Sequence, residues 1–390
     1  MSNDNKLVFN NMTEFYNSNF YKSSKKIKIK SIFEDHWDRF VEVAPSLNIK
    51  IRDVVSKEVG RLISCGTSAL GYSLYQCPDC HEFKFSFHTC KSRFCPSCGA
   101  MYVKRRIAKI LSKCYNCKHR HVVFTIPDKL RNYFFQDRSR LNLLFEAVNI
   151  TISSWFKDRS KKQNYKPGFI LVIHTYGRPL NFNPHIHGIL TEGAMGDSNI
   201  FKKFDFISYD ALRKRFQKVL LDLIELDLGK DNFRSLKNKI YSHTKDGFYV
   251  YAEKKNSHST KDMVEYAVRY TGKPAMAESR ILDYDGKYVT FWYRRHEDEL
   301  PVVEKINALE FIRRLIIHIH DENFKTVRYY GIYNKKHKFH DKMVMLVKPH
   351  FLQIQKQLNT WKMGILKDFG INPLSCPNCG CEMQYIVRVC

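Results

Sequence analysis

The cysteines constrain the fold of this chain more than any other feature of its sequence. Twelve cysteines occur in 390 residues, and two Cys-x2-Cys pairs, Cys77/Cys80 and Cys95/Cys98, stand with residues 81–94 between them. Each pair can form a tight turn that presents two thiolates to one tetrahedral zinc ion. We therefore predict that these four cysteines bind one structural Zn²⁺ with a closed coordination shell.

The remaining cysteines allow further zinc sites. Cys376 and Cys379 form half of another site by the same spacing rule. The residues that could complete it are Cys381 and Cys390 nearby, or Cys114 and Cys117 from far upstream. Near the first quartet, Cys65, His88 and Cys90 also remain. Our candidates for a further zinc site are Cys65, Cys90, Cys376 and Cys379.

The composition points to a polyanionic partner. Lysine and arginine number 65 against 39 acidic residues, which gives a formal net charge of +26. Such an excess attracts nucleic acid and gains affinity from released counterions, although it also suits a merely soluble basic surface. Basic and aromatic residues interleave in Tyr288–Arg295 and Arg328–Tyr330, as backbone contacts and base stacking require. We predict DNA contacts from Arg294, Arg295 and Arg328.

Targeting signals are not apparent in the sequence. The chain has no run of about 18 apolar residues, and its first residues lack the pattern of a signal peptide. We therefore expect a cytoplasmic, nucleoid-associated protein with no membrane partner. In such a reducing compartment, clustered cysteines bind metal more often than they form disulfides.

Hydrophobic periodicity predicts an α+β fold. The expected helices are 31–64, 139–157, 208–226, 259–272 and 308–319; the expected strands are 121–126, 169–174, 185–190, 247–252 and 288–293. We divide the chain into an N-terminal basic arm with helices (1–60), a zinc-binding domain (61–117), a core (118–300) and a helical, basic region with a zinc knuckle (301–390).

A histidine pair marks one candidate site. His185 and His187 flank one apolar residue in a predicted strand, so their imidazoles point to the same side. A second predicted strand ends at His174 and precedes the pair at hairpin distance. Mg²⁺ and Mn²⁺ prefer oxygen ligands, but Mn²⁺ accepts imidazole and keeps positions open for phosphate oxygens.

A tyrosine pair follows on a predicted helix. Tyr266 and Tyr270 share one helix face, about 40° apart at the edge of the apolar stripe. That stripe consists of Met263, Val264, Ala267 and Val268. The phenol rings can lean on the core while their hydroxyls face an open site, or both can be half-buried core tyrosines. Arg269 and Lys273 beside them are candidates to hold a scissile phosphate.

Several segments together resemble the IS91-like insertion-sequence transposases. These are two-tyrosine HUH enzymes, relatives of helitron transposases and rolling-circle Rep proteins. The segments that carry the resemblance are Phe87–Cys98, His121–Pro127, Ile173–Gly177, Asn183–Gly188, Tyr266–Gly272, Glu310–Arg314 and Arg328–Gly331. They occur in order and span most of residues 31–390, so their succession is more specific than any one motif.

The resemblance implies both architecture and roles. It implies an HUH-type endonuclease core, an antiparallel sheet flanked by helices, between an N-terminal zinc-binding domain and a basic C-terminal region ending in a cysteine cluster. By position, His185 and His187 are expected to bind a catalytic Mg²⁺ or Mn²⁺, and Tyr266 and Tyr270 to be nucleophiles. His174 is our candidate for the third ligand. The alternative third ligand is His121.

The implied activity is that of a metal-dependent tyrosine transposase. Such an enzyme nicks and rejoins single-stranded DNA through a 5′-phosphotyrosine in rolling-circle transposition. Its partners are single-stranded or hairpin DNA at transposon ends, and target DNA. One alternative is a rolling-circle replication initiator or relaxase. Another is a non-catalytic, zinc-dependent DNA-binding regulator whose histidines and tyrosines are structural.

Overall fold

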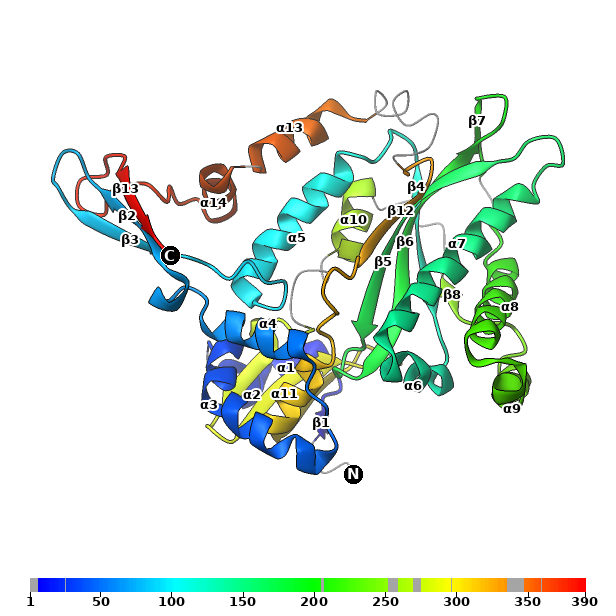
Figure 1. Ribbon diagram of the computed structural model, residues 1–390, viewed down its shortest axis with the longest axis horizontal. Coiled ribbons are helices and arrows are strands. Elements are labelled where there is room, and N and C mark those ends of the chain that lie inside the picture. Colours follow the sequence, from blue (N-terminus) through cyan, green and yellow to red (C-terminus); the bar gives the residue numbers. More distant parts are fainter. Residues whose placement is uncertain are drawn as a thin grey trace.

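The computed structural model describes residues 6–24, 26–204, 207–251, 259–268, 275–295, 297–334, 347–358 and 360–390 (Figure 1). In these residues the chain is a mixed α+β protein with three antiparallel sheets, which confirms the predicted fold class. The strands are β1 (Lys6–Val8), β2 (Tyr72–Gln76), β3 (Phe83–Phe87), β4 (His119–Thr125), β5 (Lys166–Tyr176), β6 (Phe182–Met195), β7 (Phe201–Lys203), β8 (Val250–Tyr251), β9 (Ile281–Tyr284), β10 (Tyr288–Arg294), β11 (Pro301–Asn307), β12 (Val327–Gly331) and β13 (Gln384–Val389).

Helices cover the faces of the two larger sheets. They are α1 (Met12–Asn17), α2 (Asn19–Lys22), α3 (Ile29–Val43), α4 (Asp53–Ile63), α5 (Pro96–Leu111), α6 (Asp128–Gln136), α7 (Leu141–Lys157), α8 (Tyr209–Leu228), α9 (Lys230–His243), α10 (Thr260–Val268), α11 (Ala308–Ile316), α13 (Pro349–Leu358) and α14 (Trp361–Phe369). Among the described residues, no helix combines the length and the apolar character that crossing a bilayer requires.

The largest sheet has strand order β12-β5-β6-β4-β8, with β7 paired to β6. Its central strands are buried on both faces, because helices lie on either side (Figure 1). Phe169, Leu171 and Ile173 of β5 enter the core formed with α6, α7, α8 and α9. The alternate residues Ile170 and Val172 enter the core formed with α5, α10 and α13. Side chains alternate between the two faces of the sheet along a strand, so alternate residues of β5 pack against the helices on opposite faces.

The second sheet, β1-β11-β10-β9, joins the start of the chain to a segment from its last third. Helices α3, α4 and α11 pack on it in one core. The expected boundary between residues 300 and 301 therefore falls within a hairpin, because β10 pairs with β11. The N-terminal segment is also packed rather than a free arm: β1 pairs with β11, and the ring of Phe15 is fully buried.

The third sheet, β13-β2-β3, lies at the end of the molecule opposite α8 and α9 (Figure 1). Strand β13, close to the C-terminus, pairs with β2 of the expected zinc-binding domain. Strand β12 likewise pairs with β5 of the central sheet. The expected region 301–390 is therefore not one unit, because its strands complete three different sheets.

Two of the four aromatic residues of Tyr288–Arg295 are core residues. Phe291 is fully buried, Tyr293 is 7% exposed, and Trp292 packs near the buried ring of Phe15. In the second basic and aromatic segment, Tyr330 stacks on Phe169 with ring centroids 5.2 Å apart. Phe291 and Tyr293 are therefore core residues and do not face DNA. The other rings, Tyr288, Trp292, Tyr329 and Tyr330, are half-buried, and base stacking on them stays a prediction.

Candidate functional site

Three histidines meet on the face of the central sheet that α10 covers. His174 of β5 lies directly across from His185 of β6, and His187 follows two residues later on the same face. Each of these histidines offers one ring nitrogen, and the three nitrogens lie within 4.8 Å of one another. The structure thus brings together the three histidines that we predicted as ligands, although their binding of a metal remains a prediction.

Hydrogen bonds define which ring nitrogens can accept. Nε2 of His174 lies 2.9 Å from the carbonyl oxygen of Ala267, and Nδ1 of His185 lies 2.8 Å from that of Asn183. A carbonyl only accepts, so both nitrogens are protonated donors and the opposite nitrogens carry lone pairs. A backbone acceptor behind the imidazole is the usual arrangement around a metal-binding histidine. The donor set therefore fits a divalent cation.

Burial keeps His174 and His187 uncharged. His174 is 5% and His187 is 6% exposed. Burial and, to a smaller extent, the neighbouring His185 lower the pKa of His174 to about 3. Burial and the neighbouring imidazoles of His174, His185 and His121 hold the pKa of His187 well below its ordinary value. Neutral imidazoles are the form that binds metal, so the site is ready near neutral pH without losing protons.

His121 of β4 lies beside the cluster rather than in it. Its Nε2 is 2.9 Å from Nδ1 of His187, and the two rings stack with centroids 5.1 Å apart. His121 is absent from the group whose ligand nitrogens converge. The position therefore favours His174 over His121 as the third ligand and gives His121 the place of a hydrogen-bond partner behind His187.

Helix α10 brings one tyrosine to the histidines. The Tyr266 ring lies 5.3 Å from the His121 ring and 5.7 Å from the His187 ring, between centroids. Tyr266 is 50% exposed, whereas the predicted stripe on α10 is buried. The helix begins as expected from its sequence: the backbone N–H of Ser259 bonds to the Asp262 carboxylate, and the Asp262 N–H bonds to the Ser259 hydroxyl.

Three other predicted site residues, Arg269, Tyr270 and Lys273, lie outside the described residues. The site that the structure describes therefore contains one of the two predicted tyrosines.

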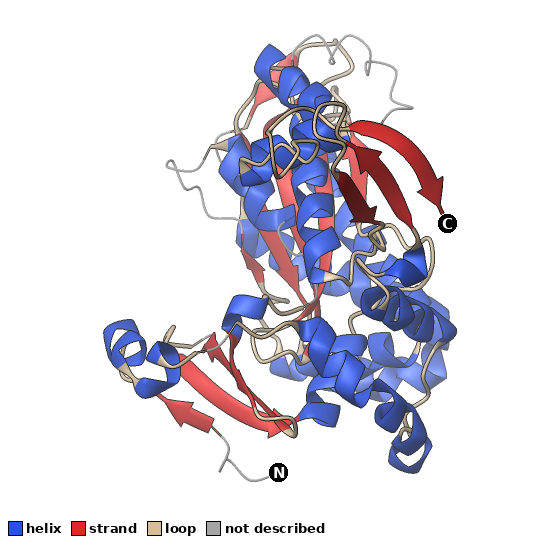
Figure 2. Cartoon of the chain, turned by 90° about the vertical axis from the view of Figure 1, so that its left-hand side faces the viewer, coloured by secondary structure: helices blue, strands red, loops and turns tan. Residues whose placement is uncertain are grey.

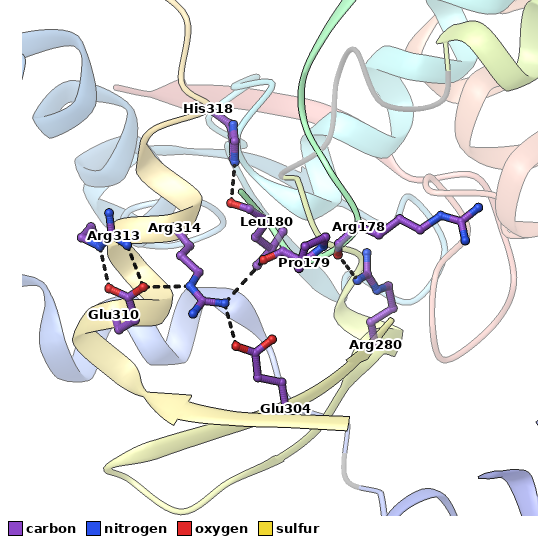
Figure 3. A network of polar contacts seen from close by, with 9 residues as sticks. All are labelled: Arg178, Pro179, Leu180, Arg280, Glu304, Glu310, Arg313, Arg314 and His318. Carbon is purple, nitrogen blue, oxygen red and sulfur yellow. Dashed lines mark hydrogen bonds and ion pairs between the residues drawn. The ribbon is translucent and has the colours of Figure 1, made fainter. Parts of the chain in front are cut away.

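The turn between β5 and β6 is anchored to the second sheet. Leu180, at the tip of this turn, is fully buried in the core of that sheet in spite of a left-handed backbone with φ of 66°. Figure 3 shows His318 and Arg314 reaching the carbonyls of Leu180 and Pro179. His174 and His185 pair across the two strands just before this turn, so its anchoring holds the end of the hairpin that carries them.

Helix α11 supplies the anchor through an ion network (Figure 3). Arg314 contacts Glu304 through Nη1 at 2.9 Å and Glu310 through Nε at 2.8 Å. Glu310 also pairs with Arg313, and the Glu304 side chain is 2% exposed. The segment Glu310–Arg314, which we used only to identify a family resemblance, thus positions the histidine hairpin.

The cysteines form two tetrathiolate groups, but not the predicted one. Cys95 and Cys98 group with Cys65 and Cys90, whereas Cys77 and Cys80 group with Cys376 and Cys379. The prediction of one site made of Cys77, Cys80, Cys95 and Cys98 is therefore wrong. The β2–β3 hairpin explains the difference, because Cys77 and Cys80 lie in its turn, at the end remote from Cys95. Cys376 and Cys379 are completed neither locally nor by Cys114 and Cys117.

The distances within both groups suit zinc. Closest sulfur–sulfur separations are 3.6 Å for Cys65 and Cys98 and 3.3 Å for Cys77 and Cys379. A zinc–sulfur distance of about 2.3 Å gives tetrahedral edges of roughly 3.8 Å. Each group has four thiols and therefore leaves no position for a substrate. Asp79, Cys379 and Cys381 make a further, overlapping group.

The arginines that we predicted to contact DNA lie away from the histidines. Arg294 ends β10 in the second sheet, and Arg295, the next residue, is paired with Asp298. Arg328 packs over the Phe145 ring of α7, 4.1 Å from its centroid, on the other face of the central sheet. Their contact with DNA stays a prediction, and none of them lies beside Tyr266.

Comparison with known proteins gives two family models and two relatives. The model of a transposase zinc-binding domain matches residues 32–126, and that of a putative transposase matches residues 168–340. The chain is 27% identical over 369 residues to the transposase for insertion sequence element IS801 of Pseudomonas savastanoi pv. phaseolicola, covering 87% of this chain and 85% of that protein. It is 27% identical over 296 residues to the putative transposase y4qJ of Sinorhizobium fredii (strain NBRC 101917 / NGR234), covering 70% and 73% of the two chains. No solved structure matches.

Proposed function

The chain belongs to the IS91-like insertion-sequence transposases, and from this premise we propose that it cuts and rejoins single-stranded DNA through a 5′-phosphotyrosine during rolling-circle transposition. One observation carries the proposal. The half-exposed phenol of Tyr266 lies beside His187, on the sheet face where the three imidazoles converge. A nucleophile and a candidate cation site therefore face the same space.

The reaction that we propose for this site is the transfer of a phosphoryl group from the DNA strand to Tyr266. A Mg²⁺ or Mn²⁺ ion held by His174, His185 and His187 would neutralise a non-bridging oxygen of the scissile phosphate. The Tyr266 hydroxyl oxygen then bonds to phosphorus as the bond to the 3′ oxygen breaks. The phenol proton is lost to solvent, and the departing 3′ oxygen gains a proton.

The same step can run in reverse. One phosphodiester replaces another, so the 3′-OH of a second strand can attack the phosphotyrosine and restore the tyrosine hydroxyl. Tyr270 is proposed as a second nucleophile from its place in the motif, which would allow two linkages to coexist. The half-exposed position of Tyr266 supports an unstacked, single-stranded substrate, because a nucleotide must reach the ring without its partner strand.

The zinc-binding domain and the excess of basic residues support binding to DNA at the transposon ends. We assign the tetrathiolate groups a structural role, since neither leaves a position for substrate.

Covalent capture of a labelled strand tests the proposal. We expect the protein to form an adduct, stable to denaturation, with single-stranded oligonucleotides from the ends of its element in the presence of Mn²⁺. Tyr266→Phe removes the attacking oxygen, so its adduct should fall at least about 100-fold or move to Tyr270. Tyr251→Phe is the matched control, because that ring also lies near His121, at 6.3 Å, but outside the tyrosine motif.

The outcomes separate the alternatives. Adducts on a plasmid replication origin but not on element ends would indicate a replication initiator. If the wild-type protein bound DNA yet never became attached to it, the phosphotyrosine mechanism would be wrong and a binding regulator would be favoured. Loss of the adduct in Tyr251→Phe but not in Tyr266→Phe or Tyr270→Phe would contradict the assignment of nucleophiles.

A further inference from the structure

A cavity of about 430 Å³ adjoins the histidine cluster. His174 itself lines it, together with the neighbouring residues 173–176 of β5. Residues 91–94, residues 318–323 and one side of α4 form the other walls. Its size lies within the roughly 300–1,000 Å³ typical of ligand-binding cavities. None of the predictions from the sequence used this space.

One wall of the cavity is a loop held at both ends by a tetrathiolate group. Residues 91–94 lie between Cys90 and Cys95, two members of that group. Within the loop, the N–H of Ser92 bonds to the Cys90 sulfur at 3.4 Å, and the N–H of Phe94 bonds to the Ser92 hydroxyl at 2.9 Å. The loop is therefore fixed before any ligand arrives.

The loop presents two cations to the cavity, Lys91 and Arg93. Within the part of the chain that the structure describes, neither forms an ion pair, and Arg93 donates one long hydrogen bond of 3.4 Å to Thr326. Lys91 is exposed and has a left-handed backbone, with φ of 55°. A side chain other than glycine or asparagine is uncommon in this conformation, so the lysine occupies a position where it is not the favoured residue.

The acidic side chains of the cavity are already paired. Glu58 contacts Arg61 at 3.0 Å, Asp321 pairs with Arg52, and Glu322 pairs with Lys57. The remaining charge at the walls is therefore positive, next to the cluster proposed to hold the cation that contacts the scissile phosphate. An anion that is continuous with the phosphate at the histidines suits this space better than a separate small molecule.

We propose that this cavity receives the nucleotide adjoining the scissile phosphate, with Lys91 and Arg93 bound to its backbone phosphate. The inference rests on the proposed function and adds a location for the flanking strand. It also gives the Cys65/Cys90/Cys95/Cys98 group a task in substrate binding: it holds the loop that presents both cations.

A thermodynamic cycle between protein and DNA tests the proposal. The probe is a single-stranded oligonucleotide with the mapped cleavage site, in which one flanking phosphate at a time is replaced by an uncharged methylphosphonate. The protein variant is Lys91→Asn/Arg93→Gln, which removes both charges, suits the left-handed backbone at residue 91 and keeps an amide donor for Thr326. The half-saturating oligonucleotide concentration for adduct formation is measured for every combination.

The charged contacts give definite expectations. In the wild-type protein, one flanking methylphosphonate should raise the half-saturating concentration about 10- to 100-fold, and the double variant should raise it by a similar factor. Combined, the two changes should cost little more than either alone, because they remove the same contact. Lys161→Ala/Lys162→Ala, two exposed lysines at the opposite end of β5, should leave the methylphosphonate effect unchanged.

The failures are distinguishable. In one outcome, the wild-type protein forms adducts while the effects of the methylphosphonate and of the double variant on the half-saturating concentration multiply at every flanking position. In that case the cavity does not hold the adjoining phosphate and the inference is wrong. If no adduct forms at all, the proposed function itself is wrong. Should the double variant lose bound zinc, the exposed single variant Lys91→Asn carries the same cycle, with half of the charge removed.

Discussion

At the scale of single residues, the cross-strand partner of a histidine decides whether its ring nitrogen joins the candidate metal site. His121 and His174 both belong to strands beside β6, and the sequence offers both as a third ligand. Register separates them: His174 stands across from His185, whereas His121 stands across from Ile189 and reaches His187 only diagonally. His174 therefore joins the converging nitrogens, and His121 supports one of them from behind.

This arrangement predicts the effect of changing His121. His121→Ala removes the hydrogen-bond partner of His187, and loss of such a partner costs roughly 10- to 100-fold in metal affinity. We expect the Mn²⁺ concentration for half-maximal adduct formation to rise by that factor. His121→Gln keeps a polar partner and should lose less. His36→Ala, at a partly exposed histidine on α3, should have no effect on the Mn²⁺ dependence. An unchanged Mn²⁺ dependence in His121→Ala would contradict the assigned role.

At the scale of elements, the sequence identified the helices and strands that build the site. The capped start and buried stripe of α10, and the alternation in β5 and β6, are local patterns, so they could be read without knowing the fold. The contacts that anchor the β5–β6 turn could not be predicted from the sequence in this way. These contacts join Pro179 and Leu180 to Arg314 of α11 and to His318 just beyond it, more than 130 positions later, and no local periodicity encodes such a pairing.

The ion network of α11 gives a prediction at this scale. Arg314→Lys keeps the charge but cannot contact Glu304, Glu310 and the Pro179 carbonyl at once, because it lacks the guanidinium fork. We expect the free energy of unfolding to fall by about 1–3 kcal/mol, as measured by urea denaturation, and Mn²⁺ affinity to weaken. Arg313→Lys is the matched control on the same helix.

The control differs in its surroundings. Arg313 pairs with Glu310 in a position where both side chains are about one third exposed, so its loss should cost less than about 1 kcal/mol. Equal losses of stability in the two variants would mean that the buried Glu304 is not the partner that matters.

At the scale of the whole molecule, the two tetrathiolate groups have different consequences. The Cys65/Cys90/Cys95/Cys98 group lies beside the second core and the cavity next to His174. The Cys77/Cys80/Cys376/Cys379 group joins the turn of the β2–β3 hairpin to the C-terminal segment. It belongs to the sheet that projects from the molecule in Figure 1 and faces the viewer in Figure 2. The Cys65/Cys90/Cys95/Cys98 group therefore supports the histidine site. The Cys77/Cys80/Cys376/Cys379 group links the C-terminal segment to the β2–β3 hairpin.

Removing zinc from one group at a time should separate support of the histidine site from attachment of the C-terminal segment. Cys376→Ser/Cys379→Ser should lower bound zinc from two ions per chain to one, as measured by elemental analysis, and expose the C-terminal segment to proteolysis. Adduct formation on a short oligonucleotide should persist, because the histidine cluster is remote. Cys65→Ser/Cys98→Ser should also lose one ion, but adduct formation should fall with it. The reverse pattern of activity would contradict this division.

The sequence by itself determined the α+β class, the strands and helix that carry His174, His185, His187 and Tyr266, and the zinc-binding character of the cysteines. These properties depend on periods of two and 3.6 residues and on ligand type, which neighbouring residues encode. Only the tertiary structure decided which cysteines group together, that the Phe291 and Tyr293 rings are buried, and that the loop between Cys90 and Cys95 lines a cavity together with His174. Those depend on contacts between distant segments, whose pairing is set by the packing of whole sheets and not by spacing along the chain.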